Sequence, residues 1–212
     1  RTAVLVRRLR GEGELIGGMR PYVADVLACS AWFDQQFLYA KKPKRAEHHW
    51  QTSLLQLREM QLDRVVLLTN SLRTAWMAWQ TGADERIGQA GNLRSSFLTT
   101  KVYPPRRGRR RVTLPAIDGY LQVATAAGCP PESPSLCLAT TPSDEQAADD
   151  VWRQLGLPRD GVTVLNTGGA FGAAKIWPAE HFARLAQTLV DQHGMHVLIN
   201  CGPKERDAAQ KI

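Results

Sequence analysis

A glycine-containing segment near residue 170 has the residue types of an anion-binding site. Residues 162–165 (Val-Thr-Val-Leu) are typical of a buried strand, and residues 166–174 follow with three glycines. The next helix is expected to start near Pro178. A strand that passes through a glycine-rich loop into a helix presents free backbone N–H groups and the positive end of the helix dipole. That arrangement suits a phosphate group.

Lys175 adds a cation to this segment, where it could neutralise a pyrophosphate. The spacing is neither G-x-x-x-x-G-K-[ST] nor G-x-G-x-x-G. The residues alone therefore leave two interpretations open: a phosphate site, or a plain strand-to-helix connection with a surface lysine. Trp177 is equally open, because it could line a nucleotide site or anchor the start of the helix.

Most of the positive charge is concentrated in residues 106–111. The chain of 212 residues has a net charge of +7, and without the five arginines of this segment it would be +2. These five are Arg106, Arg107, Arg109, Arg110 and Arg111. The segment is predicted to be a loop, and three interpretations are open. It is a basic loop that is merely solvated, it binds the phosphates of an acidic glycolipid or an anionic membrane face, or it binds nucleic acid. Nucleic acid is not expected, because the interleaved aromatic residues of single-strand binders are missing.

The elements that position these residues alternate between short apolar strands and helices. Strands are predicted at 14–19, 34–39, 64–69, 85–88, 162–165 and 196–200, and helices at 2–10, 21–27, 50–60, 72–80, 117–127, 143–155, 178–190 and from 204. Ser143 is the predicted N-cap of the helix at 143–155. Such alternation predicts parallel sheets covered by helices, an α/β fold.

Several functional classes have no support in the sequence. The scattered cysteines form no C-x-x-C pair and predict free, mostly buried thiols in a reducing, cytoplasmic compartment; they are Cys29, Cys129, Cys137 and Cys201. No apolar run reaches the length of a membrane span. The histidines lack partners that would complete a metal site, so no metal is expected.

Three segments resemble glycosyltransferase family 9, the lipopolysaccharide heptosyltransferases. Residues 166–178 (NTGGAFGAAKIWP) are similar to the loop that opens the second domain of that family. Residues 64–88 and 117–128 resemble, in the same order, a strand, a helix and the interdomain helix of its first domain.

The resemblance implies a GT-B architecture with two Rossmann-like parallel-sheet domains. We expect an acceptor-side domain at 1–127, a linker at 128–142 and the start of a nucleotide-sugar domain at 143–212. Both domains are expected to be incomplete: the first lacks its first strand, and most of the second is missing. The implied reaction transfers heptose from ADP-heptose to a phosphorylated lipopolysaccharide core, without a metal or other cofactor. It would take place in the cytoplasm, with possible peripheral contact with the inner membrane.

The resemblance also suggests roles for single residues. Thr167, Gly168 and Lys175 match the donor-phosphate positions, and Glu205 falls near an acidic residue that contacts the nucleoside. The arginine segment 106–111 would contact the acceptor or an anionic surface.

Two features of the family do not match this sequence. The proposed general base is an aspartate after the first strand, and that position would lie before Arg1. The D-[ST]-G-x-x-H segment that holds the donor sugar would lie after Ile212. We therefore expect little or no activity from these 212 residues. The alternative is a non-catalytic nucleotide- or anion-binding remnant of the same fold.

Overall fold

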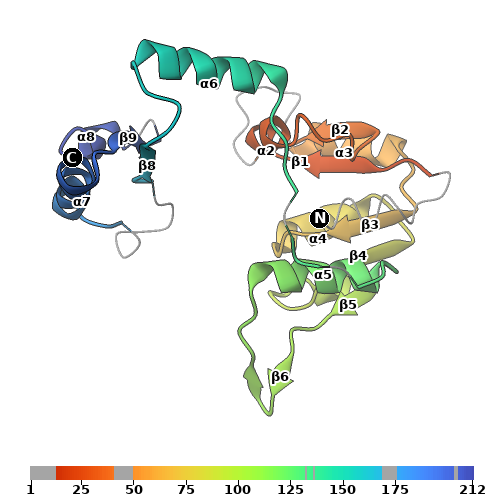
Figure 1. The fold of residues 1–212 in the computed structure, drawn as a ribbon. Coiled ribbons are helices and arrows are strands. Elements are labelled where there is room, and N and C mark those ends of the chain that lie inside the picture. The colour runs from red at the N-terminus through yellow and green to blue at the C-terminus, as the bar shows by residue number, and fades with distance from the viewer. Residues whose placement is uncertain (1–12, 41–49, 132, 136, 169–175, 203–204) are drawn as a thin grey trace. The chain divides into compact units, whose positions relative to one another are not determined.

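The computed structural model describes residues 13–40, 50–131, 133–135, 137–168, 176–202 and 205–212, which form parts of two compact units (Figure 1). Unit 1 extends to Thr141 and unit 2 begins at Pro142. The predicted helix at 2–10 lies outside the described residues, as does Lys175. The two units are described separately.

Unit 1 alternates strands and helices, and its elements are β1 (Ile16–Met19), α2 (Pro21–Val26), β2 (Gln35–Leu38), α3 (Trp50–Glu59), β3 (Arg64–Leu67), α4 (Leu72–Gln80), β4 (Glu85–Gln89), the 3-10 helix η2 (Ser95–Phe97), β5 (Thr100–Val102), β6 (Arg106–Arg107), β7 (Arg110–Arg111) and α5 (Ala116–Ala126). Strands β1 and β2 pair in parallel. Strands β3, β4 and β5 form a second parallel sheet in that order. The α/β prediction is confirmed.

Unit 2 repeats the same arrangement on a smaller scale. Its elements are α6 (Pro142–Gln154), β8 (Val162–Asn166), α7 (Ala179–His193), β9 (His196–Asn200) and α8 (Arg206–Ala209). Strands β8 and β9 are parallel, so α7 is the crossover helix between them. Helix α7 is capped at its C-terminus by Gly194, whose φ of 60° is the left-handed conformation that glycine adopts without strain.

The core of unit 1 lies between the central strand β4 and helix α5. Ile87 of β4 is fully buried and packs with Val123 and Ala127, and the half-buried Val66 and Val102 of the two flanking strands complete the cluster. Apolar residues from all three strands therefore meet one helix. This contact fixes α5, and with it the residues that α5 places at the edge of the sheet.

The turn between β3 and α4 ends in an N-cap. Ser71 has extended backbone angles, and its hydroxyl accepts a hydrogen bond of 3.2 Å from the backbone N–H of Thr74. This N-cap satisfies one of the donors that the first turn of a helix leaves free.

Three sequence predictions are corrected. Helix α6 begins at Pro142, so Ser143 lies in its first turn and not at the N-cap. Residues 106–111 are a β-hairpin and not a loop. The prediction of mostly buried thiols is wrong, because Cys129 is buried whereas Cys29 and Cys137 are exposed.

Among the described residues, none of the helices is both long and apolar enough to cross a membrane.

Replacement of Ile87 by alanine should lower the free energy of unfolding by about 2–5 kcal/mol, because it leaves a cavity in the cluster between β4 and α5. Leu55→Ala, at a side chain of α3 that is 60% exposed, is the control and should change it by less than about 1 kcal/mol. Denaturant unfolding followed by circular dichroism measures both. Equal effects of the two substitutions would contradict the assignment of this core.

Candidate functional site

The carboxyl ends of β8 and β9 bring two loops of unit 2 together. The strands are in register from Val162 opposite His196 to Asn166 opposite Asn200, so both end at the same level. Beyond them, the backbone N–H of Thr167 donates to the carbonyl of Asn200 at 3.1 Å. Ligands of parallel α/β sheets bind at this edge of the sheet.

The loop after β8 turns immediately beyond the strand. The backbone N–H of Gly168 donates to Oδ1 of Asn166 at 3.1 Å, so the side chain of the last strand residue holds the first glycine of the loop. The hydroxyl of Thr167 is buried and has no hydrogen-bond partner within the described part of the chain. A buried hydroxyl without a partner at a ligand-binding edge is a candidate ligand contact.

Glu205 reaches this edge from the other loop. Its carboxylate accepts a hydrogen bond of 2.9 Å from the N–H of Gly202, and its own N–H donates to the carbonyl of Gly202 at 2.9 Å. A Cβ atom at Gly168 would lie only 2.9 Å from Oε2 of Glu205. Gly168 and Glu205, 37 positions apart in sequence, are therefore neighbours.

The position of Glu205 limits what the edge can bind next to it. A carboxylate repels a phosphate, but it accepts hydrogen bonds from the hydroxyls of a ribose, as acidic residues of Rossmann folds do. Of the sequence-predicted donor residues, Thr167 and Gly168 come together with Glu205.

Trp177 packs on the first turn of α7. Its ring stacks on His181 with centroids 5.5 Å apart, and it meets Phe182 edge to face at 4.8 Å. These contacts favour the anchoring interpretation of Trp177, although 46% of its surface is exposed.

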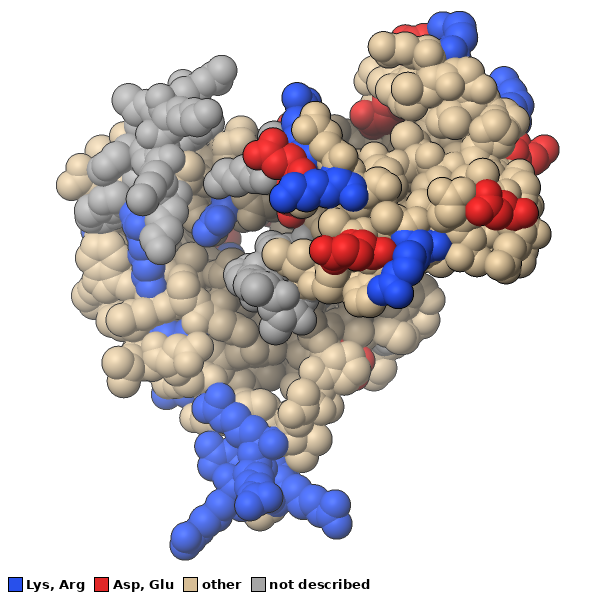
Figure 2. Space-filling view, turned by 90° about the vertical axis from the view of Figure 1, so that its left-hand side faces the viewer, with Lys and Arg blue, Asp and Glu red and all other residues tan. Residues whose placement is uncertain are grey.

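The five arginines of unit 1 lie on an exposed hairpin. Strand β6 pairs antiparallel with β7, which places Arg106 opposite Arg111 and Arg107 opposite Arg110. The turn contains Gly108 with a φ of 62°. Figure 2 shows a projection covered with basic side chains. Within the described chain no carboxylate forms an ion pair with them, and like charges on paired strands repel. The hairpin is thus a concentrated, unneutralised positive surface.

A second polar site in unit 1 was missed by the sequence reasoning. Asn70 follows β3, Gln89 ends β4, and their side-chain amides are joined by a hydrogen bond of 2.9 Å beside a cavity of about 210 Å³. Arg94, which is fully buried, holds Asn70 from the other side. Burial lowers the pKa of the Arg94 guanidinium. The one signal in the sequence was Gly119 in the middle of α5, since a glycine there costs about 1 kcal/mol relative to alanine.

The described residues contain no group of three or more His, Cys, Asp and Glu side chains that could hold a metal ion.

Comparison with known proteins gives a consistent result. The family model for "Glycosyltransferase family 9 (heptosyltransferase)" matches residues 52–212. Lipopolysaccharide heptosyltransferase 2 of Escherichia coli K12 is 28% identical over 162 residues, which are 74% of this chain and 45% of that protein. The Salmonella typhimurium protein of the same name is 27% identical over 161 residues, with the same coverage. The chain thus spans about half the length of the curated relatives it matches.

Two solved structures share the fold. A family 9 glycosyltransferase from Veillonella parvula aligns with a TM-score of 0.76 at 21% identity, covering 98% of this chain and 59% of the other. The E. coli ADP-heptose lipopolysaccharide heptosyltransferase II aligns with a TM-score of 0.70 at 18% identity, covering 99% and 62%. At this identity the likeness concerns the fold.

Replacing Glu205 by alanine should raise the hydrogen-exchange rate of the Gly202 amide about tenfold or more, because that amide loses a charged acceptor. Glu205→Gln retains an acceptor oxygen and should raise the rate less. Exchange measured by NMR compares the two variants. An unchanged Gly202 rate in Glu205→Ala would show that the carboxylate does not hold the loop.

Proposed function

Since this chain belongs to glycosyltransferase family 9, its match covering residues 52–212, we propose that it is a glycosyltransferase which moves heptose from ADP-heptose to a phosphorylated lipopolysaccharide core. The relatives' names supply the reaction class. The observation that carries the proposal within this chain is the meeting of Gly168 and Glu205 at the carboxyl edge of β8 and β9. A non-catalytic nucleotide-binding protein of the same fold is the alternative.

The donor nucleotide is proposed to bind at this edge. Glu205 accepts hydrogen bonds from hydroxyls of the nucleoside. The hydroxyl of Thr167 and the N–H groups of the glycine loop contact the pyrophosphate. Lys175 neutralises the charge that develops on the departing ADP. This assignment uses no metal.

The arginine hairpin is proposed to contact the phosphates of the acceptor glycolipid at the cytoplasmic face of the inner membrane. Guanidinium groups pair with phosphate in a bidentate manner, and five of them on a four-residue ladder and its turn form a dense cationic surface. Their mutual repulsion is relieved when phosphates lie between them. The proposed location is therefore cytoplasmic, with peripheral contact with the membrane.

Binding of ADP tests the donor site without requiring turnover. Calorimetry should show that the intact chain binds ADP, and that Lys175→Ala weakens binding about tenfold or more through loss of a charge-assisted contact. Thr167→Val should weaken binding by about two- to tenfold, because it removes one neutral hydrogen bond. Lys211→Ala, which removes an exposed charge from the same unit, is the control.

Failure of both site variants to change ADP affinity would move the nucleotide away from this edge. If ADP binds and ADP-heptose binds no more tightly, the non-catalytic alternative is favoured.

Vesicle sedimentation tests the hairpin. The chain should associate with vesicles containing phosphatidylglycerol and not with phosphatidylcholine alone, and the association should fall as salt is raised. Replacing all five hairpin arginines by glutamine should abolish it. The control for the same fall in net charge replaces five exposed arginines on five different helices by glutamine: Arg58, Arg73, Arg153, Arg184 and Arg206. Equal losses would assign the association to general basicity.

A further inference from the structure

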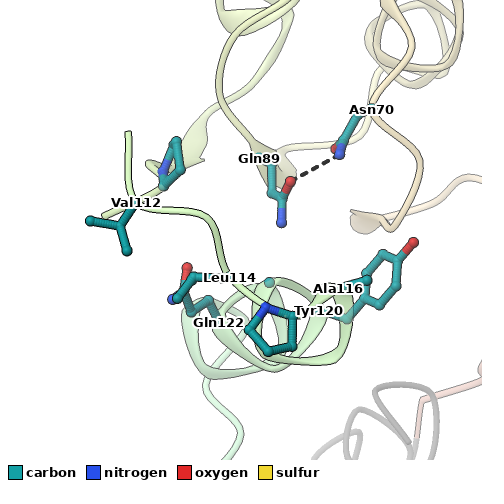
Figure 3. A pocket seen from close by; sticks show the side chains of 10 residues that line it. Asn70, Gln89, Val112, Leu114, Ala116, Tyr120 and Gln122 are labelled. Atoms are coloured by element: carbon teal, nitrogen blue, oxygen red, sulfur yellow. Dashed lines mark hydrogen bonds between the residues drawn. The ribbon is translucent and has the colours of Figure 1, made fainter. Parts of the chain in front are cut away.

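The cavity at the carboxyl edge of β3 and β4 is lined by α5 and the segment before it, by Pro104, and by two amide side chains from the sheet side (Figure 3). These amides belong to Asn70, which follows β3, and Gln89, the last residue of β4. Both come from strand ends, where parallel sheets place ligand contacts. No motif in the sequence indicated a functional role for Asn70 or Gln89.

A buried guanidinium fixes the orientation of the first amide. Nη1 of Arg94 donates to the carbonyl of Thr69 and to Oδ1 of Asn70, the latter at 3.4 Å. An arginine has donors only, so Asn70 must turn its oxygen toward Arg94 and its NH₂ group away. The carbonyl of Asn70 also accepts a 3.2 Å hydrogen bond from Asn92, which holds the backbone of the turn.

The first amide in turn orients the second. Nδ2 of Asn70 donates to Oε1 of Gln89 at 2.9 Å, which commits the Gln89 oxygen. The remaining group, the Nε2 amide of Gln89, points into the cavity (Figure 3). Arg94, Asn70 and Gln89 thus form a series, here called the amide relay. Each residue donates a hydrogen bond to the next, and the last donor, Nε2 of Gln89, faces the cavity.

Helix α5 is shaped to admit this last donor. A Cβ atom at Gly119 would lie 2.6 Å from Nε2 of Gln89, closer than any real contact. The amide of Gln89 therefore packs against the bare backbone of α5, and a larger side chain at position 119 would displace the amide from this orientation.

The electrostatic environment of the cavity favours a negatively charged ligand. The side chain of Arg94 is 0% exposed, and within the described residues its Nε and Nη2 atoms have no hydrogen-bond partner and no carboxylate forms an ion pair with it. A buried charge without a counter-charge is costly, and its field is weakly screened. The hydrogen bonds of the relay orient the NH₂ group of Gln89 toward the cavity, where an anionic oxygen would accept a hydrogen bond from it.

We propose that the cavity beside Asn70, Gln89 and Gly119 is an oxyanion-binding site that takes a carboxylate or phosphate group. Nε2 of Gln89 is the contacting donor, and Arg94 is a positioning residue that acts through Asn70. The site lies entirely within unit 1. The inference does not depend on the proposed donor site in unit 2, and either can fail without the other.

The test follows the side-chain amide of Gln89 by NMR in the full 212-residue chain during titration with three probes. Inorganic phosphate and glucuronate represent the two oxyanions, and methyl glucoside is the neutral control. At least one anion should shift the Gln89 signals saturably, and the one that binds more tightly identifies the group. Methyl glucoside should leave them unchanged. No saturable shift with either anion, or an equal shift with methyl glucoside, overturns the proposal.

Two substitutions separate the relay from general packing. Gln89→Glu keeps the size of the side chain and its acceptor for Asn70, but replaces the cavity donor by a negative oxygen. Affinity for the anion should fall at least about tenfold. Gln56→Glu, an exposed change of equal charge on α3, should leave it unchanged. Unchanged affinity in Gln89→Glu would exclude Gln89 as the contact.

Asn70→Asp tests the role of Arg94 without removing the buried charge. The new carboxylate pairs with Arg94, so the melting temperature should rise, yet it cannot donate to Gln89 and the anion affinity should fall. A structural role alone would raise stability and leave binding intact, which would overturn the positioning role.

Discussion

Parallel pairing of strands is the constraint on which both polar sites depend. In a parallel sheet the carboxyl ends of neighbouring strands lie at one edge, and the crossover helices leave that edge open. Asn70 and Gln89 come together because β3 and β4 are parallel neighbours. Gly168 and Glu205 come together because β8 and β9 are. Strand pairing thus makes neighbours of residues that are far apart in the sequence, and no bond between their side chains is needed to bring them together.

The polar groups at the two sheet edges carry opposite charges. In unit 2, the carboxylate of Glu205 accepts a hydrogen bond from a backbone N–H of its own loop and lies next to Gly168. In unit 1, Arg94 is a buried positive charge, and within the described residues Nη1 is the only one of its three nitrogens that donates a hydrogen bond. Leaving buried donors unsatisfied costs about 1–3 kcal/mol each, so the surrounding core must offset that cost. The packing of Ile87 against Val123 is part of what does so.

The sequence was informative where apolar periodicity decides structure. The strands from Arg64 and from His196 and the helix Leu72–Gln80 were predicted because each buries a regular apolar face or run. Strands β6 and β7 were missed because arginines carry no apolar pattern, and the hairpin is held by backbone pairing and the turn at Gly108. Arg94 was missed because its burial results from a contact 25 positions away, with Thr69. The roles of Thr167, Gly168 and Glu205 came from resemblance and remain predictions. The adjacency of Gly168 and Glu205 follows from strand register, which no local sequence pattern specifies.

The arginine hairpin raises the question of how a segment with so little to bury keeps its shape. Its strands are two residues long, all four strand arginines are exposed, and each faces another across the ladder. The backbone bond from Val112 to the carbonyl of Pro105, at 2.9 Å, extends the pairing toward the body of unit 1. Each like-charged pair opposes the pairing by a few tenths of a kcal/mol up to about 1 kcal/mol. An anion bound between the strands would reverse the sign of that contribution. If the proposed phosphate contact is made, the same charges that bind the phosphate also stabilise the pairing of the hairpin.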